Sequence, residues 1–248
     1  MSNKMGKMSD LKRAMDRAYA PAVIDIETAG DGKAVARSLL RPPKFEAPKN
    51  YKDEDKKREY VAKRLDEWRA ETAGKAALSP LTGRVVAVSQ LVCAGYDDSP
   101  EESVAVDGMD ERLLLTEVAD RLQHKTPVVT FNGYDFDVWF LRVRMIANGV
   151  TVPRCLLPGP RYDTSTHFDV RMVLTNGNSR VKGKLEDWHR LITGEDIPTI
   201  EHPLHGTPIN GADVGGLMAS GHEQIVGEYC LNDARATWRI YKAIRHTC

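Results

Sequence analysis

The sequence lacks long hydrophobic runs. No stretch of its 248 residues approaches the roughly 18 uninterrupted apolar residues that a membrane-spanning helix needs. The opening residues, MSNKMGKMSDLKR, are polar and contain no apolar signal-peptide segment. The sequence therefore predicts a cytoplasmic protein with no membrane partner.

Cysteine pairs and net charge are also lacking. The four cysteines are widely separated and form no CxxC pair, so neither a disulfide framework nor a zinc ribbon is indicated. The 35 basic and 35 acidic side chains cancel, so the composition alone does not indicate a nucleic-acid-binding protein. Any affinity for phosphate must come from local patches or from bound metal.

The hydrophobic pattern that is present predicts an α/β fold. Expected strands are 22–28, 85–93, 103–106, 127–131 and, less regularly, 167–170, and expected helices are 110–124, 136–148, 184–192 and 223–244. Three early strands in succession predict antiparallel pairing. The second half of the chain is expected to be mainly helical.

The predicted organisation is a polar N-terminal arm over residues 1–19 and one domain over 20–248. A charged, proline-containing insertion is expected at about 41–76. Its side chains at helical spacing form one narrow stripe of Val61, Leu65, Trp68 and Thr72. A solvated surface helix docked by this stripe is favoured over a nucleic-acid-binding arm, because its charges are mixed in sign.

Two acids occupy the first predicted strand. Successive strand side chains point to opposite faces, so Asp25 and Glu27 share one face with Val23. Burying neighbouring carboxylates is costly unless a cation compensates them, and oxygen ligands suit magnesium or manganese. The alternative is that Glu27 lies at the strand end and is simply solvated.

Two further acids follow an Asn-Gly turn in the segment FNGYDFDVWFL at 131–141. The turn connects a strand to a helix and so delivers an acid to the edge of a sheet. Either acid could be merely structural. We predict that Asp135 caps the helix and that Asp137, in its first turn, takes part in chemistry.

The last helix carries a tyrosine and an acid on one face. Tyr229 and Asp233 are four residues apart, which places them side by side on a helix. Taken singly, they would be a packed aromatic and a solvated acid. Their occurrence together with the earlier acids, in this chain order, favours a shared site.

These segments resemble the three motifs of the DEDD exonucleases. DIET at 25–28 is similar to the first motif, 131–141 to the second, and YCLND at 229–233 to the third, of the YxxxD type. A histidine-bearing relative would have histidine where this chain has Glu228, so the tyrosine subclass is favoured. Within it, the chain resembles the predicted exonucleases related to the proofreading domain of family B DNA polymerases.

The resemblance spans approximately residues 20–245, with secondary similarity at 77–88 and 167–170. It implies a ribonuclease-H-like fold, with a mixed five-stranded sheet flanked by helices. It also implies hydrolysis of single-stranded nucleic acid from the 3′ end, with DNA favoured over RNA. Replication or repair proteins are possible partners.

The resemblance implies two divalent cations, Mg²⁺ or Mn²⁺, held roughly 3.5 to 4 Å apart to activate water and stabilise the leaving oxyanion. Asp25 would bridge both ions, and Glu27 and Asp233 would complete the site of the attacking water. Asp137 would hold the second ion. Tyr229 would orient the water, because a phenol with an ordinary pKa near 10 is a poor base at neutral pH.

An exonuclease must also bind the end of the nucleic-acid strand. The predicted substrate-binding residues are Asn132, Thr28, Arg180, Lys182 and Lys184. The segment 179–184 is locally basic, with Arg171 and Arg190 nearby, and could contact phosphates. Loops of this composition are more often only solvated.

Two rival functions fit less well. A catalytically inactive nucleic-acid-binding or replication scaffold would not need all four acids and the tyrosine. A nucleotide-cofactor site at Gly30-Asp31-Gly32 lacks a third glycine in register. A proline-rich charged stretch is also expected there in place of a helix.

Overall fold

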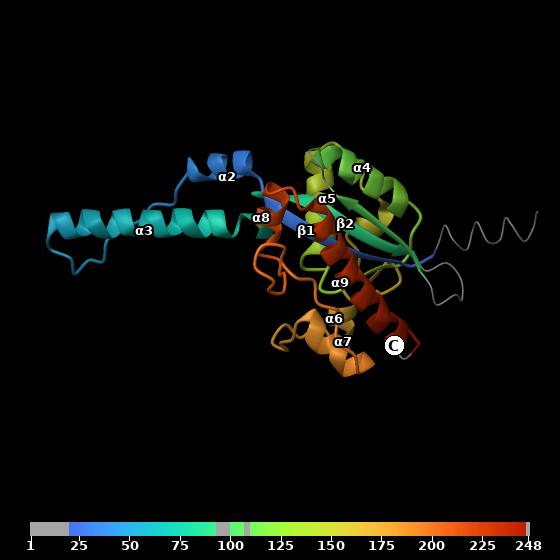
Figure 1. The fold of residues 1–248 in the computed structure, drawn as a ribbon. Coiled ribbons are helices and arrows are strands. Elements are labelled where there is room, and N and C mark those ends of the chain that lie inside the picture. Colours follow the sequence, from blue (N-terminus) through green and yellow to red (C-terminus); the bar gives the residue numbers. More distant parts are fainter. Residues whose placement is uncertain (1–19, 93–99, 107–109, 247–248) are drawn as a thin grey trace, which may run out of the picture. The chain divides into compact units, whose positions relative to one another are not determined.

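The computed structural model describes residues 20–92, 100–106 and 110–246, and it shows a five-stranded sheet flanked by helices (Figure 1). The strand order is β3-β2-β1-β4-β5. The strands are β1 (Ala22–Gly30), β2 (Gly83–Val92), β3 (Glu101–Val106), β4 (Val128–Thr130) and β5 (His167–Asp169). Because β2 and β3 are antiparallel while β1, β4 and β5 are parallel, the sheet is mixed. The predicted α/β, ribonuclease-H-like fold is confirmed.

The chain groups into two compact units. One contains the residues up to Glu27 together with those from Val85 onward, and the other is Thr28–Arg84. The boundaries predicted from the sequence, including the insertion at 41–76, stay a prediction. The predicted polar arm at 1–19 lies outside the described residues.

In the unit Thr28–Arg84, a helix directly follows β1. This helix, α2 (Gly32–Leu39), begins at Asp31, whose carboxylate accepts hydrogen bonds from the backbone N–H groups of Lys33 and Ala34. The expectation of a charged stretch in place of a helix was therefore wrong. An aspartate before a helix satisfies N–H groups that have no partner within the helix, and this capping signal was overlooked.

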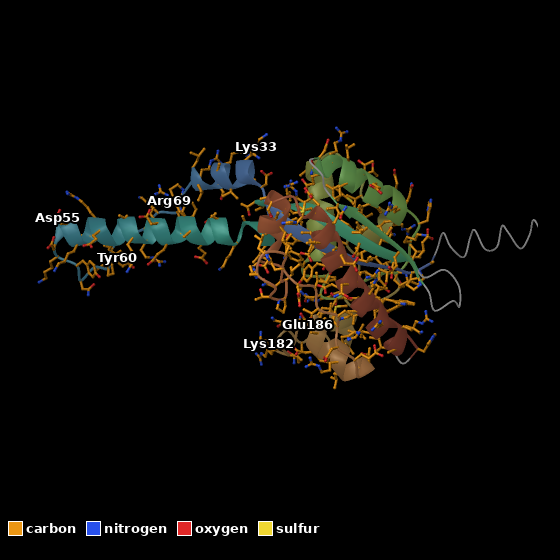
Figure 2. The ribbon with its side chains drawn as sticks, in the orientation of Figure 1. Lys33, Asp55, Tyr60, Arg69, Lys182 and Glu186 are labelled. Carbon is orange, nitrogen blue, oxygen red and sulfur yellow. The ribbon has the colours of Figure 1, made fainter. Side chains whose placement is uncertain are left out.

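The same unit contains the charged helix α3 (Glu54–Gly74), none of whose residues is fully buried. Its side chains project on all sides in Figure 2, where Asp55, Tyr60 and Arg69 are labelled. Ion pairs such as Lys57 to Glu54 at 2.6 Å join neighbouring turns. The predicted stripe of Val61, Leu65, Trp68 and Thr72 is half-buried, and most of the other side chains are exposed. This agrees with the predicted solvated helix.

In the other unit, helices cover both faces of the sheet. Alternate residues of β1 point to opposite sides, so Ile24 packs in the cluster formed with α4 (Glu111–Leu122) and α5 (Asp137–Ala147). Val23 packs in the second cluster, mainly with α9 (Glu223–Ile244). Three shorter helices are α6 (Val170–Thr175), α7 (Leu185–Thr193) and α8 (Val214–Ala219). The acids of β1 point to the same side as Val23, toward α9.

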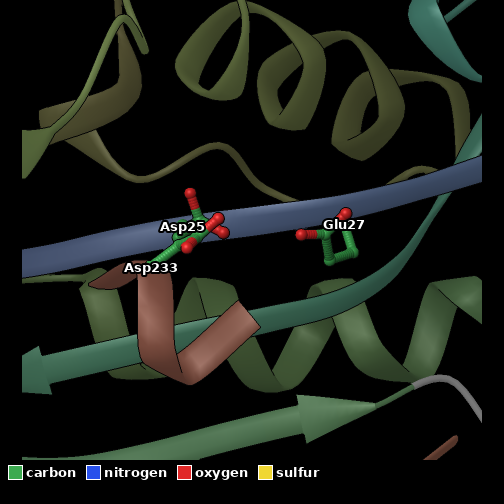
Figure 3. A group of neighbouring side chains, drawn as sticks. All are labelled: Asp25, Glu27 and Asp233. Carbon is green, nitrogen blue, oxygen red and sulfur yellow. The ribbon is translucent and has the colours of Figure 1, made fainter. Parts of the chain in front are cut away.

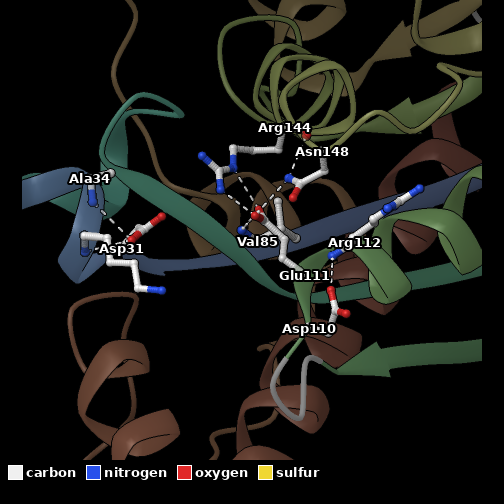
Figure 4. A network of polar contacts seen from close by, with 9 residues as sticks. Asp31, Ala34, Val85, Asp110, Glu111, Arg112, Arg144 and Asn148 are labelled. Atoms are coloured by element: carbon white, nitrogen blue, oxygen red, sulfur yellow. Dashed lines mark hydrogen bonds and ion pairs between the residues drawn. The ribbon is translucent and has the colours of Figure 1, made fainter.

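One buried carboxylate, Glu111, joins three elements of this unit (Figure 4). It accepts hydrogen bonds from the backbone N–H of Val85 at 2.8 Å and from Nε of Arg144 at 2.8 Å. The side-chain amide of Asn148 donates a further bond at 3.1 Å. Glu111 therefore ties α4 to β2 and to α5 with its charge fully paired.

Candidate metal and nuclease site

Three acids from the two ends of the chain meet beside β1. Asp25 and Glu27 project from β1 and Asp233 from α9 (Figure 3). One carboxylate oxygen from each lies within 4.8 Å of the others. The predicted convergence of the strand acids with the last helix is therefore present in the structure.

The helix α9 is fixed over the strands by small polar contacts. Ser89 of β2 donates from Oγ to the backbone carbonyl of Cys230 at 2.9 Å. The thiol of Cys230 donates to the backbone carbonyl of Asp25 at 3.3 Å. Because Asp233 follows Cys230 by three residues, its side chain comes from the adjacent turn on the same side of the helix.

The fourth predicted acid, Asp137, reaches the site from the first turn of α5. It is 5% exposed, and its Oδ1 accepts a hydrogen bond from the backbone N–H of Ile26 at 3.2 Å. Since Ile26 lies between Asp25 and Glu27, this bond brings the helix terminus against the strand that carries both acids. The predicted position in the first turn is confirmed.

The cap expected at Asp135 is absent. The N-cap of α5 is Phe136, which makes no side-chain capping bond. Asp135 is exposed and instead pairs with Arg161 at 3.5 Å. The capping assignment was therefore wrong: the helix begins one residue later than the Asn-Gly turn suggested, and Asp135 points to solvent.

The pKa values of all four acids are raised in the folded protein. Burial is the main cause that raises the pKa of Asp25 and of Glu27 well above their usual values, and the neighbouring acids raise both further. Burial also raises the pKa of Asp137 and of Asp233 from 3.8 to about 7. Four carboxylates cannot all ionise here without a compensating cation. Their all-oxygen donor set fits hard divalent cations.

The acids open into a cavity of about 300 Å³. Its lining comprises Asp25, Ile26, Glu27, Phe131, Asn132, Phe136, Asp137, Arg171, Gly183, Leu185 and Asp233. The cavity therefore places the four acids beside the Asn-Gly turn and beside the basic segment at 179–184. The four acids and one basic side chain, Arg171, thus line the same cavity.

A family description matches residues 78–247 of the chain. The chain belongs to a family of predicted 3′-5′ exonucleases related to the exonuclease domain of PolB. The match includes the second and third motif segments, while Asp25 and Glu27 lie outside it. In the structure, Asp25 and Glu27 nevertheless lie close to Asp233, which is within the matched residues. No curated protein matches the chain.

Tyr229 of this exonuclease-family chain lies near the acids. Burial raises the pKa of its phenol, and the charges of Asp233, Glu27 and Asp25 raise it further. The phenol therefore keeps its proton and can donate a hydrogen bond, which fits the predicted orienting role better than proton abstraction.

None of the helices in the described part of the chain is long and apolar enough to cross a membrane.

The predicted substrate-binding residues have different surroundings. Asn132 lines the cavity, whereas the buried hydroxyl of Thr28 donates to the carbonyl of Ala77 at 2.8 Å. The basic side chains Arg180, Lys182 and Lys184 are exposed, and Lys182 is labelled in Figure 2. Their binding roles stay predictions.

One buried acid with a positioning role, Asp169, was missed from the sequence. It is 2% exposed and accepts backbone hydrogen bonds from Asn132 at 3.1 Å and from Tyr134 at 2.9 Å. It also caps α6 by accepting a bond from the N–H of Met172 at 3.0 Å. These bonds hold the Asn-Gly turn against β5, with Asn132 at a φ of 65°. The signal was an aspartate directly before a helix, in HFDV.

Proposed function

We propose that this protein is a metal-dependent exonuclease that hydrolyses single-stranded nucleic acid from the 3′ end, with DNA favoured over RNA. The observation that carries the proposal is the set of four acids, from β1, α5 and α9, whose pKa values are all raised. Structural carboxylates of this chain, such as Glu111, are paired with cations and amides. Unpaired acids gathered in one cavity need a cationic ligand.

Two divalent cations, Mg²⁺ or Mn²⁺, would supply an activated water and a stabilised leaving oxyanion when bound. Asp25, whose pKa is raised by burial and further by all three other acids, would help to hold both cations. Glu27 and Asp233 would complete the site of the attacking water, and Asp137 would hold the second. The protonated phenol of Tyr229 would orient the water, and Asn132 would contact the terminal sugar.

The alternative is a catalytically inactive nucleic-acid-binding or replication scaffold of the same fold. Such a protein would bind nucleic acid without cleaving it. The retention of all four acids and of Tyr229 in one region favours the enzyme, because unpaired buried acids reduce stability and have no use in a scaffold. Replication or repair proteins are partners that fit either function.

The test is digestion of end-labelled single-stranded DNA and RNA with Mg²⁺ or Mn²⁺. The wild type is expected to shorten the substrate from its 3′ end, and more rapidly with DNA. Asp25→Asn and Asp233→Asn should each lose at least about 100-fold in rate, the size associated with losing one group that stabilises transition-state charge. Asp135→Asn is the matched control, because it removes an exposed acid and should keep full activity.

Thermal unfolding of each variant shows whether the fold is retained. Equal activity in the wild type, Asp25→Asn and Asp233→Asn would refute the assigned chemistry. Tight binding of single-stranded DNA by the wild type, with no shortening under either metal, would favour the scaffold.

A further inference from the structure

Arg171 is a cationic side chain in the cavity of the acids. It is the second residue of α6 and lines the same cavity as Asp25 and Asp233. Among the described residues, no ion pair includes Arg171. By contrast, the part-buried Arg144 pairs with Glu111. The charge of Arg171 is therefore uncompensated in a half-buried position.

Two neutral acceptors hold the Arg171 guanidinium in place. Its Nη1 donates to the side-chain oxygen of Asn132 at 3.0 Å, and its Nη2 donates to the backbone carbonyl of Val181 at 3.0 Å. A guanidinium carries more N–H donors than these two bonds use. The group is thus fixed between the Asn-Gly turn and the basic segment, with donors left over for a ligand.

The wall beside Arg171 is bare backbone. Gly183 lines the cavity with a φ of +137°, and a Cβ at this position would lie 2.7 Å from Nε1 of Trp188. A side chain here would strain the backbone and strike the indole. The segment therefore passes close to Trp188, and Gly183 lines the cavity without a side chain.

Arg171 and the acids enter the cavity from different elements. Arg171 comes from α6, whereas Asp25 and Glu27 come from β1 and Asp233 from α9. A scissile phosphate at the acids would be neutralised by the cations held there. The next phosphate along the strand would have no such cation and would need a positive side chain.

We propose that Arg171 binds the phosphodiester next to the scissile one, and so makes the site selective for a polymeric strand over a single nucleotide ester. This rests on the proposed exonuclease function. The planar guanidinium can donate two parallel hydrogen bonds to phosphate oxygens. Fixed by Asn132 and Val181, it loses little conformational entropy on binding.

The test compares two substrates that differ in this phosphate. One is a single-stranded oligonucleotide, and the other is the p-nitrophenyl ester of thymidine 5′-monophosphate, which has one phosphodiester only. Arg171→Gln is expected to lower kcat/KM for the oligonucleotide by about 10- to 100-fold, typical of a lost charged hydrogen bond. It should leave kcat/KM for the ester within about two-fold of wild type, since the ester lacks the second phosphate and the Asn132 backbone stays bonded to Asp169.

Two further variants sharpen the comparison. Arg171→Lys keeps the charge and is expected to recover part of the oligonucleotide activity. Arg239→Gln is the matched control, because Arg239 is exposed on α9 and pairs with Glu195. It should behave as wild type with both substrates.

Salt dependence gives a readout that a purely structural role would not change. Oligonucleotide binding is measured by fluorescence anisotropy with Ca²⁺ as the divalent ion, over a range of salt concentrations. Arg171→Gln should reduce the slope of log K against log salt by about 0.7, the value for one phosphate contact on a single strand. Arg239→Gln should leave the slope unchanged.

The outcomes separate this inference from the function on which it rests. An equal loss on both substrates, with a lower unfolding temperature and an unchanged salt slope, would make Arg171 a structural clamp and overturn the inference alone. Unchanged oligonucleotide cleavage would do the same. If the wild type cleaved neither substrate, the exonuclease proposal would fail and this inference with it.

Discussion

The carboxylate of Glu111 and the four acids of the cavity lie in the same unit but have opposite surroundings. Glu111 is surrounded by an arginine, an amide and a backbone N–H, so every part of its charge is met. The pKa values of Asp25, Glu27, Asp137 and Asp233 are raised mainly by burial and further by neighbouring acids. The first arrangement stabilises the fold. The second reduces stability, and acids with raised pKa values in a cavity are typical of a functional site.

Removing Glu111 should produce the largest change in stability. Glu111→Ala leaves Arg144 buried without its anion, so the free energy of unfolding should fall by about 3 to 5 kcal/mol. Glu117→Ala on the same helix removes an exposed partner of Arg121 and should cost at most about 1 kcal/mol. Urea denaturation measures both. Similar losses in the two variants would show that Glu111 is not a structural centre.

The pH dependence of the metal-free protein should be opposite in sign to ordinary acid denaturation. The pKa values of Asp137 and Asp233 rise from 3.8 to about 7 on folding, so the folded state holds protons that the unfolded state releases. The free energy of unfolding should therefore fall as the pH rises from 3.8 to about 7, by up to about 4 kcal/mol for each of the two groups.

This dependence is measured by urea denaturation with a chelator present, at a series of pH values. Asp137→Asn removes one of the groups that titrate in this range and should flatten the profile. A profile that stays steep in this variant, or one that rises with pH in the wild type, would contradict the assignment of mutually destabilising acids.

Divalent cations should convert the destabilising cluster into a stabilising one. Mg²⁺ or Mn²⁺ at 100 times the dissociation constant should raise the free energy of unfolding by about 2.7 kcal/mol. The gain should disappear in Asp25→Asn and persist in Asp135→Asn, which lies outside the cluster. Differential scanning fluorimetry with and without the metal tests this, and equal gains in both variants would place the ion elsewhere.

Substitution of Asp169 should lower the free energy of unfolding less than substitution of Glu111, because the partners of Asp169 are backbone N–H groups. Asp169→Asn keeps one oxygen acceptor but places an amide against a donor, so a loss of about 1 to 3 kcal/mol is expected. Urea denaturation in chelator measures it without a contribution from metal. A loss as large as that of Glu111→Ala would show that the Asn-Gly turn contributes more to stability than its hydrogen bonds indicate.

Much of the fold could be predicted from local patterns. The predicted ends of strand β1 and helix α9 lie within two residues of the observed ends. This is because the spacing of apolar side chains along a strand or a helix can be read directly from the sequence. Two of the wrong predictions concerned the residues that cap helices. Asp31 begins a helix that was not expected, and Asp135 does not cap α5. Short polar side chains suit caps, turns and solvent equally well, so type and spacing do not separate these roles.

The sequence by itself determined which residue types were available: acids on one face of β1, an acid after the Asn-Gly turn, and a tyrosine and an acid on one face of α9. Only the tertiary structure decided which of them share a cavity. It paired Glu111 with Arg144, and it gathered the four acids and Arg171 around one cavity. The reason is physical: periodicity fixes the direction of a side chain within its own element. Burial and charge compensation depend on elements that are distant in the chain.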